Sequence, residues 1–356
     1  MKNSKKCLAI ILLLTLCVLM IHSALVIYID PFFHFHAPLS EYYYKRPETV
    51  ERYLNDGIVR HFDYDALITG VSISSGFSIS EFNSLFDVNA QKVIYSGGTL
   101  KEHGEGIDRA LKTNPDTKIV LCSLFLTKLY QDKDHRRADI TDYPTYLYND
   151  LLVDDLKYVL NKEVVFNYCY PMIKAKLEGK DGGVESFDTK GYIGVADSEI
   201  ERYNDDNCVA MTPRIGKEIE QFQISDEEAK NVRENVTQNV LRCAANNPDT
   251  RFIYFIPPCS ILFYKDLYDN GELLKTIQAE EIAVNMMVQY DNIELYSFND
   301  GSVIEDLHNY SDSVHYGGWI YSMILESISA EKGRITKDNV AQYCNKEYDY
   351  FLNYNY

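Results

Sequence analysis

The stretch DYDALITGVSISSGFS, residues 63–78, begins as a buried strand and ends in a turn that carries four serines. The apolar run at residues 65–69 predicts a short strand, and the pattern at residues 77–86 predicts a helix. Between them the chain turns at Gly70. Parallel sheets bind ligands just beyond the carboxyl ends of their strands, which is where these serines fall. The stretch therefore predicts a strand–turn–helix unit with a site at its turn.

Four more predicted strands and several helices follow this unit. The strands are expected at residues 92–95, 118–124, 251–256 and 293–298, and the helices at residues 102–112, 226–245 and 274–290. Strands that alternate with helices at this spacing indicate βαβ units and a parallel sheet covered on both faces. The fold class predicted from the sequence is therefore α/β.

Residues 127–223 break the alternation and are interpreted as an insertion. The run YPTYLYNDLLVDDLKYVLNK, residues 143–162, predicts a helix, and DTKGYIGVADSE, residues 188–199, predicts a turn or hairpin. Its many tyrosines fit either ordinary half-buried packing or a lid over the edge of the sheet. The tail, residues 338–356, predicts a peripheral helix.

The first thirty residues predict a signal anchor, which is a transmembrane helix that stays attached. Residues 7–29 are uncharged and apolar, and about 20 such residues span the hydrocarbon core of a bilayer. The run continues past the small residues Ser23 and Ala24, although a cleaved secretory signal peptide is the alternative. Lys2, Lys5 and Lys6 precede the run, so the positive-inside rule places the domain at residues 31–356 outside the cytoplasm. The expected location is the cell membrane, with a single span.

The charge and the cysteines exclude several classes of function. The formal net charge of −18 arises from 53 acidic and 35 basic residues, and no basic cluster is larger than a pair, so nucleic acid is not an expected partner. None of the eight cysteines follows a metal-site spacing, so no metal is expected. Buried free thiols are as consistent with their scatter as disulfides are, and no specific bridge is predicted.

Ser72, Asp312 and His315 form the candidate catalytic group. A serine hydroxyl needs a base to take its proton, and the base needs a third group to orient it. In NYSDSVHYGGW, residues 309–319, the three-residue spacing lets the carboxylate of Asp312 reach Nδ1 of His315 while Nε2 faces a hydroxyl. The alternative for Ser72 is a helix-capping role, and for Asp312 and His315 a cap and a solvated surface histidine.

These motifs resemble the SGNH (GDSL-like) hydrolase superfamily. Gly70, Val71 and Ser72 stand where that family has its Gly-Asp-Ser block, and Asp312 and His315 stand where it has its terminal Asp-x-x-His. Valine in place of the block's aspartate is similar to the membrane-anchored envelope branch, whose members serve teichoic-acid D-alanylation and polysaccharide O-acetylation. The resemblance implies a flavodoxin-like three-layer parallel sheet.

The resemblance also implies an oxyanion hole. The amide of Ser72 would be one donor, and SGGT, residues 96–99, offers Gly97 or Gly98 as the glycine of the second block. The asparagine of the third block is missing, because VLCSLFLTKL, residues 120–129, contains none. Loss of one such donor can cost about 10²- to 10³-fold in rate.

The sequence therefore predicts an extracytoplasmic serine acyl-esterase or O-acyltransferase that acts on a cell-envelope glycan through an acyl-serine. No cofactor is implied. A membrane-bound O-acyltransferase is the partner that the resemblance implies, beside the membrane itself and the glycan or acyl ester. The alternative is a non-catalytic SGNH-like module that binds envelope polymer or scaffolds a membrane acyltransferase.

Overall fold

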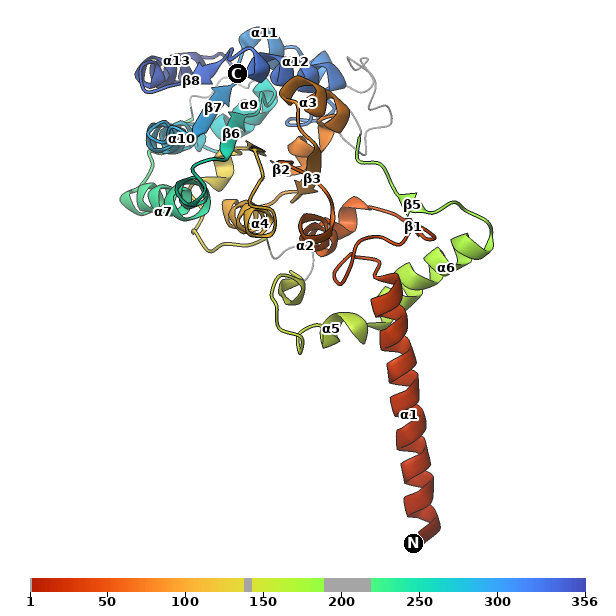
Figure 1. Cartoon of the computed structure of the whole chain (residues 1–356). Helices are drawn as coiled ribbons and strands as arrows, with labels where there is room; N and C mark the ends of the chain where they lie inside the picture. The colour runs from red at the N-terminus through yellow and green to blue at the C-terminus, as the bar shows by residue number, and fades with distance from the viewer. Residues whose placement is uncertain (1, 138–142, 189–218) are drawn as a thin grey trace. The chain divides into compact units, whose positions relative to one another are not determined.

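The computed structural model describes residues 2–137, 143–188 and 219–356 (Figure 1). Most of the hairpin expected at residues 188–199 lies outside them. The chain forms two compact units: unit 1 is Met1–Phe62 with Thr141–Ser186, and unit 2 is Asp63–Ile140 with Phe187–Tyr356. Residues 31–62 thus group with the N-terminal helix and part of the insertion, whereas the sequence-based division began a single domain after residue 30.

Unit 2 is built on a six-stranded sheet in the order β3-β2-β4-β6-β7-β8. The first five of these strands are parallel and the short β8 is antiparallel to β7. Their bounds are β2 Ala66–Gly70, β3 Ala90–Ile94, β4 Ile119–Ser123, β6 Arg251–Ile256, β7 Ile293–Ser297 and β8 Arg334–Ile335. The five predicted strands are confirmed to within two residues at each end, and the mixed α/β class with a parallel-rich sheet is confirmed with them.

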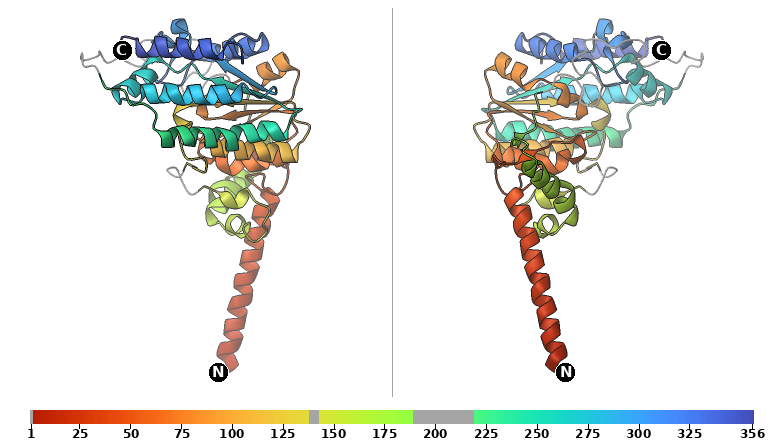
Figure 2. Two further views of the ribbon diagram at one scale, coloured as in Figure 1. Left: turned by 90° about the vertical axis from the view of Figure 1, so that its left-hand side faces the viewer. Right: turned by 90° about the vertical axis from the view of Figure 1, so that its right-hand side faces the viewer.

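Helices cover both faces of this sheet. On one face α4 (Leu100–Thr113), α7 (Asp226–Val236), α10 (Leu273–Met287) and α13 (Val340–Leu352) run side by side (Figures 1 and 2). On the other face α3 (Ile79–Phe86) packs against α12 (Gly318–Ser329). α4 and α7 each begin with a capping box, in which Thr99 and Ser225 are the N-caps. The predicted helix at 226–245 continues from α7 through a π-helical turn (Thr237–Leu241) into α8 (Arg242–Asn246).

The core of unit 2 lies between β2, β6 and the α3–α12 pair. Every residue of β2 and β4 is buried, because both strands are covered on two faces and hence carry continuous apolar runs. Phe77 is fully buried, and its ring meets the edges of Phe255 and Tyr321 at centroid distances of 5.4 and 5.1 Å. This packing fixes the chain that leaves the β2 turn.

Unit 1 contains α1 (Lys2–Ile29), α2 (Glu51–His61), α5 (Leu156–Val159), a π-helical segment η5 (Val164–Cys169) and α6 (Tyr170–Leu177), with β1 (Tyr43–Tyr44) paired to β5 (Gly183–Val184). The helix predicted at residues 143–162 is wrong, because turns and short helical pieces occupy that range. The side chain of Asn149 accepts a hydrogen bond from the Leu151 N–H and donates one to Asp154. Such side-chain bonds compete with the helical backbone bonds.

The C-terminal end of α1 belongs to the packed interior of unit 1. Residues 5–29 form the one helix among the described residues that is long and apolar enough to cross a membrane, with a mean hydropathy of 2.8. Beyond it, the buried carboxylate of Asp30 accepts hydrogen bonds from the Phe35 and His36 amides at 2.6 and 3.1 Å and from the Tyr158 hydroxyl at 2.9 Å. These bonds join the end of the helix to segments far away in the sequence.

Candidate functional site

Gly70 ends β2 in a backbone conformation that favours glycine, with φ of +127°. A Cβ atom at this position would lie 2.2 Å from Oγ of Ser123 and 2.5 Å from Oγ of Ser74. No other residue fits there without moving the end of β4. The chain then enters a short 3-10 helix whose first residue is Ser72.

Three of the four serine hydroxyls of the turn have partners, and these partners differ. Ser74 is fully buried and donates to Oγ of Ser123 at 2.9 Å, which also accepts from the Val71 amide at 3.2 Å. Ser78 is the N-cap of α3 and accepts from the Glu81 amide at 3.2 Å. Ser72 alone of the four is hydrogen-bonded to a histidine. Helix capping therefore explains Ser78 but not Ser72.

The structure brings Ser72 to His315 and Asp312, which follow it by 243 and 240 positions in the sequence. Oγ of Ser72 lies 2.9 Å from Nε2 of His315, and Nδ1 of His315 lies 2.6 Å from Oδ2 of Asp312. Oδ1 of Asp312 accepts from the amides of Val314 and His315, both at 2.8 Å. Nucleophile, base and orienting carboxylate thus form one chain of hydrogen bonds.

The loop that carries Asp312 and His315 is fastened to the chain after β6. The hydroxyl and amide of Ser260 both donate to the Ser313 carbonyl, at 2.9 and 3.0 Å. The Tyr310 hydroxyl donates to the Pro258 carbonyl at 2.7 Å. Because β6 belongs to the same parallel sheet as β2, these bonds hold His315 at the sheet edge where Ser72 emerges.

The environment keeps Asp312 ionised. Burial acts to raise the pKa of Asp312, but the hydrogen bond and charge of His315 and the two amide donors outweigh it, so the pKa is lowered. An ionised carboxylate accepts the Nδ1–H of a neutral imidazole and leaves Nε2 free to accept a proton from a hydroxyl. The geometry therefore suits removal of the Ser72 proton.

The second-block loop follows β3 beside this site. The Tyr95 amide donates to the Gly70 carbonyl at 2.9 Å, which sets residues 96–97 next to the start of the Ser72 turn. The Gly98 amide is used within its own turn, donating to the Tyr95 carbonyl at 2.6 Å. Among the described residues, no acceptor takes the amides of Gly97 and Ser72. Of the two candidate glycines, Gly97 is thus the one whose N–H remains available.

Arg137 is a residue near this site that the sequence reasoning missed. Its Nη1 donates to the Ser96 carbonyl at 2.8 Å, and a Cβ atom at Gly97 would lie 2.0 Å from that nitrogen. Gly97 has φ of +60°, so both the backbone and the guanidinium require glycine. The signal available in the sequence was only the pair Arg136–Arg137 in the insertion, which does not indicate contact with Gly97.

The SGNH resemblance would place an asparagine just after β4, and this chain has none there. Ser123 is the last residue of that strand, and its hydroxyl supports the turn by accepting from Val71 and Ser74. The next amide, that of Leu124, donates to the Phe255 carbonyl at 2.8 Å. The Leu124 amide is therefore already used within the sheet.

Comparison with known proteins gives this chain no assignment: no protein-family model matches it, and no curated protein matches it. The SGNH resemblance therefore depends on the motifs and on the geometry around them.

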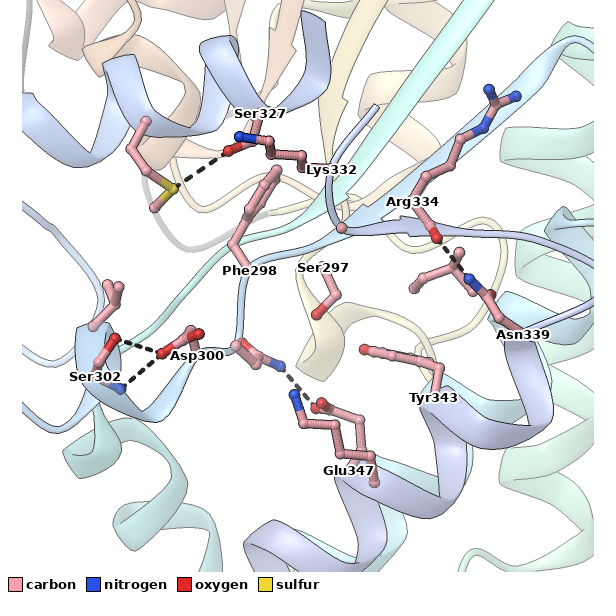
Figure 3. Close-up of a pocket in the computed structure, with 16 residues that line it drawn as sticks. Ser297, Phe298, Asp300, Ser302, Ser327, Lys332, Arg334, Asn339, Tyr343 and Glu347 are labelled. Carbon is pink, nitrogen blue, oxygen red and sulfur yellow. Dashed lines mark hydrogen bonds between the residues drawn. The ribbon is translucent and has the colours of Figure 1, made fainter. Parts of the chain in front are cut away.

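A cavity of about 460 Å³ lies away from this site, where β7 ends against α12, β8 and α13 (Figure 3). Ser72, Asp312 and His315 do not line it. Glu347 and Asn299 are the buried polar residues on its wall, and Nδ2 of Asn299 donates to Oε2 of Glu347 at 2.9 Å. Burial raises the pKa of Glu347 to about 7, and burial together with the nearby Glu347 raises that of Glu280, which accepts a hydrogen bond from Tyr343.

We predict that Glu347→Gln raises stability at high pH and changes it little at low pH. The folded chain holds a proton on Glu347 that the unfolded chain releases above about pH 4.3. The contribution of this group to the free energy of unfolding therefore falls as pH rises above about 4.3 and is lost near pH 7. Glutamine keeps an acceptor for Asn299 and has no charge to bury. Thermal unfolding at about pH 4 and about pH 8 should show a benefit on the order of a few kcal/mol only at the higher pH.

Glu326→Gln, at an exposed position of α12, is the matched control and should leave the pH profile unchanged. Equal effects of Glu347→Gln at both pH values would contradict a raised pKa.

Proposed function

We propose that this protein is a serine acyl-esterase or O-acyltransferase that carries the acyl group on Ser72. The observation that carries the proposal is the hydrogen-bonded chain Ser72–His315–Asp312 at the carboxyl edge of the parallel sheet. An unactivated serine hydroxyl is a poor nucleophile at neutral pH, and this chain supplies what it lacks.

The proposed reaction runs in two transfers of the acyl group. Oγ of Ser72 attacks the acyl carbonyl carbon while Nε2 of His315 takes the hydroxyl proton, and Asp312 stabilises the imidazolium that forms. The intermediate then collapses, the bond to the leaving alcohol breaks, and His315 returns the proton to that oxygen. Water or a glycan hydroxyl next attacks the acyl-serine with the same proton transfers, and Ser72 is regenerated.

The order of strands supports an SGNH-like, flavodoxin-like arrangement. Numbered along the chain, β3-β2-β4-β6-β7 has the order 2-1-3-4-5, which is that of flavodoxin-like doubly wound sheets. In such sheets ligands bind where the order reverses, which here is at the carboxyl end of β2. Ser72 follows β2 directly.

The amides of Ser72 and Gly97 are the proposed donors to the oxyanion, and we propose that Arg137 partly replaces the missing asparagine. Its guanidinium contacts Gly97, so positive charge lies beside the position where negative charge would develop. Preorganised charge of this kind stabilises acyl-transfer intermediates.

The proposed setting is the outer face of a membrane that α1 crosses once. The lysines before α1 favour a cytoplasmic N-terminus. We propose an envelope glycan as the acceptor and a membrane-bound O-acyltransferase as the partner, and both proposals depend on the SGNH resemblance. The rival function, a non-catalytic module that binds envelope polymer, is favoured by one observation: β4 ends without an amide side chain for an oxyanion.

We predict that a serine-reactive phosphonate labels wild-type protein on Ser72, and that Ser72→Ala and His315→Ala each abolish the labelling. Removing either member of a cooperating pair costs on the order of 10⁴-fold or more in acyl transfer, about as much as removing both. Mass spectrometry of the labelled peptide reports the site, and ester turnover reports the rate.

Ser74→Ala is the matched control, because it removes a hydroxyl from the same turn and costs the bond to Ser123 without touching His315. It should keep the label. Wild-type labelling by a folded Ser72→Ala protein would favour the binding module instead.

For Arg137 we predict that Arg137→Gln slows phosphonate labelling by up to about 10²-fold, because positive charge beside the oxyanion is lost. Arg136→Gln is the matched control: that arginine pairs with Glu105 at 2.6 Å instead, and its loss should leave the labelling rate unchanged. Equal rates in both variants would remove Arg137 from the proposed site.

The proposed topology predicts that protease added to intact cells stripped of their wall digests the globular units, because residues after α1 face the outside. A cytoplasmic protein serves as the control and must survive. Protection of both proteins would place the units in the cytoplasm.

A further inference from the structure

Large exposed apolar side chains are concentrated in one stretch of unit 1. In the described part of the chain, nine such side chains outside α1 are exposed, and eight of them lie within residues 151–177. They are Leu151, Leu152, Val153, Leu156, Leu160, Phe166, Tyr170 and Leu177. Among the residues of unit 2 that the structure describes, Phe222 is the one such side chain. Apolar exposure concentrated in one segment in this way indicates a surface that is covered in the working protein.

This surface lies beside the C-terminal end of α1 (Figure 1). α1 packs against α5 and η5, and Val26 and Ile29 are buried there, whereas Leu8 to Ile21 are mostly more than half exposed. About 20 residues cross the hydrocarbon core, so a span that starts after Lys6 ends near Val26. α5 and η5 therefore lie at the depth where acyl chains meet headgroups.

The charge of residues 151–177 also differs from that of the chain. Four lysines oppose three acidic residues there, a net charge of +1 in a chain whose net charge is −18. Lys157, Lys162 and Lys174 are each at least 60% exposed, and each lies 3.7–4.0 Å from a neighbouring surface carboxylate, a separation at which an exposed pair is weak. Lysines whose stems lie along apolar surface extend their ammonium groups to lipid phosphates, and anionic lipids attract them.

Hydrogen bonds hold the surface in place against α1. The Tyr158 hydroxyl of α5 donates to Asp30 at 2.9 Å, and Nε2 of His34 lies 2.9 Å from Oδ1 of Asp155. Asp30 directly follows α1, so α5 cannot leave the helix without breaking buried bonds.

We infer that residues 151–177 form a membrane collar, a surface that lies in the interfacial layer of the bilayer that α1 crosses. The inference depends on the proposed anchoring by α1. The collar's leucines and Phe166 enter the acyl boundary, as the apolar faces of interfacial helices do, while its lysines stay at the headgroups. Unit 1 is then fixed by two contacts with lipid, the span and the collar.

The test uses the full chain in vesicles of phosphatidylcholine and phosphatidylglycerol. Cys7, Cys17 and Cys208 are replaced by alanine. An environment-sensitive thiol fluorophore is placed at Leu152→Cys, because the side chain at this position is 83% exposed. Asp181→Cys, at an exposed polar position of the same unit, is the matched control. Nitroxide-labelled lipids should quench the probe at 152 and not that at 181, and aqueous iodide should quench 181 several-fold more strongly than 152.

Two results would overturn the collar. Equal iodide quenching at both positions would place Leu152 in water, and protection at 152 from both quenchers would indicate a protein occupant. Alkaline carbonate extraction of the same vesicles separates this failure from failure of the anchor: a chain released by carbonate refutes the anchoring, whereas a retained chain with Leu152 in water refutes only the collar.

Discussion

The structure around the candidate site depends on one steric constraint, the space left for residue 70. The strand ends β2 and β4 are neighbours in the sheet, and the hydroxyls of Ser74 and Ser123 meet where a side chain at 70 would stand. Glycine lets the backbone turn above this contact, and the turn points the hydroxyl of Ser72 toward His315. The sheet is therefore not only a scaffold under the site, because its strand spacing determines the direction of the nucleophile.

Most strands and helices of unit 2 could be predicted from the sequence because local residue patterns determine them. The strands from 66 to 297 are short apolar runs bounded by turns. Thr99 and Ser225 are N-cap residues of the kind that mark the start of a helix. The three candidate catalytic residues were also predictable, since each stands in a motif of fixed spacing. That they meet within hydrogen-bonding distance is geometry that the motifs alone could not provide.

The sequence-based predictions fail where contacts between distant residues determine the local structure. Residues 143–162 have helical periodicity, yet the bonds made by Asn149 and the docking of Tyr158 on Asp30 impose turns. Arg137 reaches Gly97 because the residues just before it are bonded to the loop between β3 and α4. One of these bonds runs from the Thr99 hydroxyl to the His135 carbonyl, at 2.7 Å. The choice between Gly97 and Gly98 likewise needed the turn bond from Gly98 to Tyr95. No local pattern encodes these contacts.

The interleaving of the two units has a consequence for the order of folding. β1 is synthesised before β2, but its partner β5 follows the first three strands of unit 2. Asp30 likewise cannot bind Tyr158 until 128 more residues have been made. A chain made from its N-terminus presents α1 first, so the buried end of that helix lacks its packing partners α5 and η5 until residue 169 has emerged. During synthesis the polar backbone around Asp30 must stay hydrated while β2, β3 and β4 become available to pair, so unit 1 is completed only after three of the five parallel strands of unit 2 have been made.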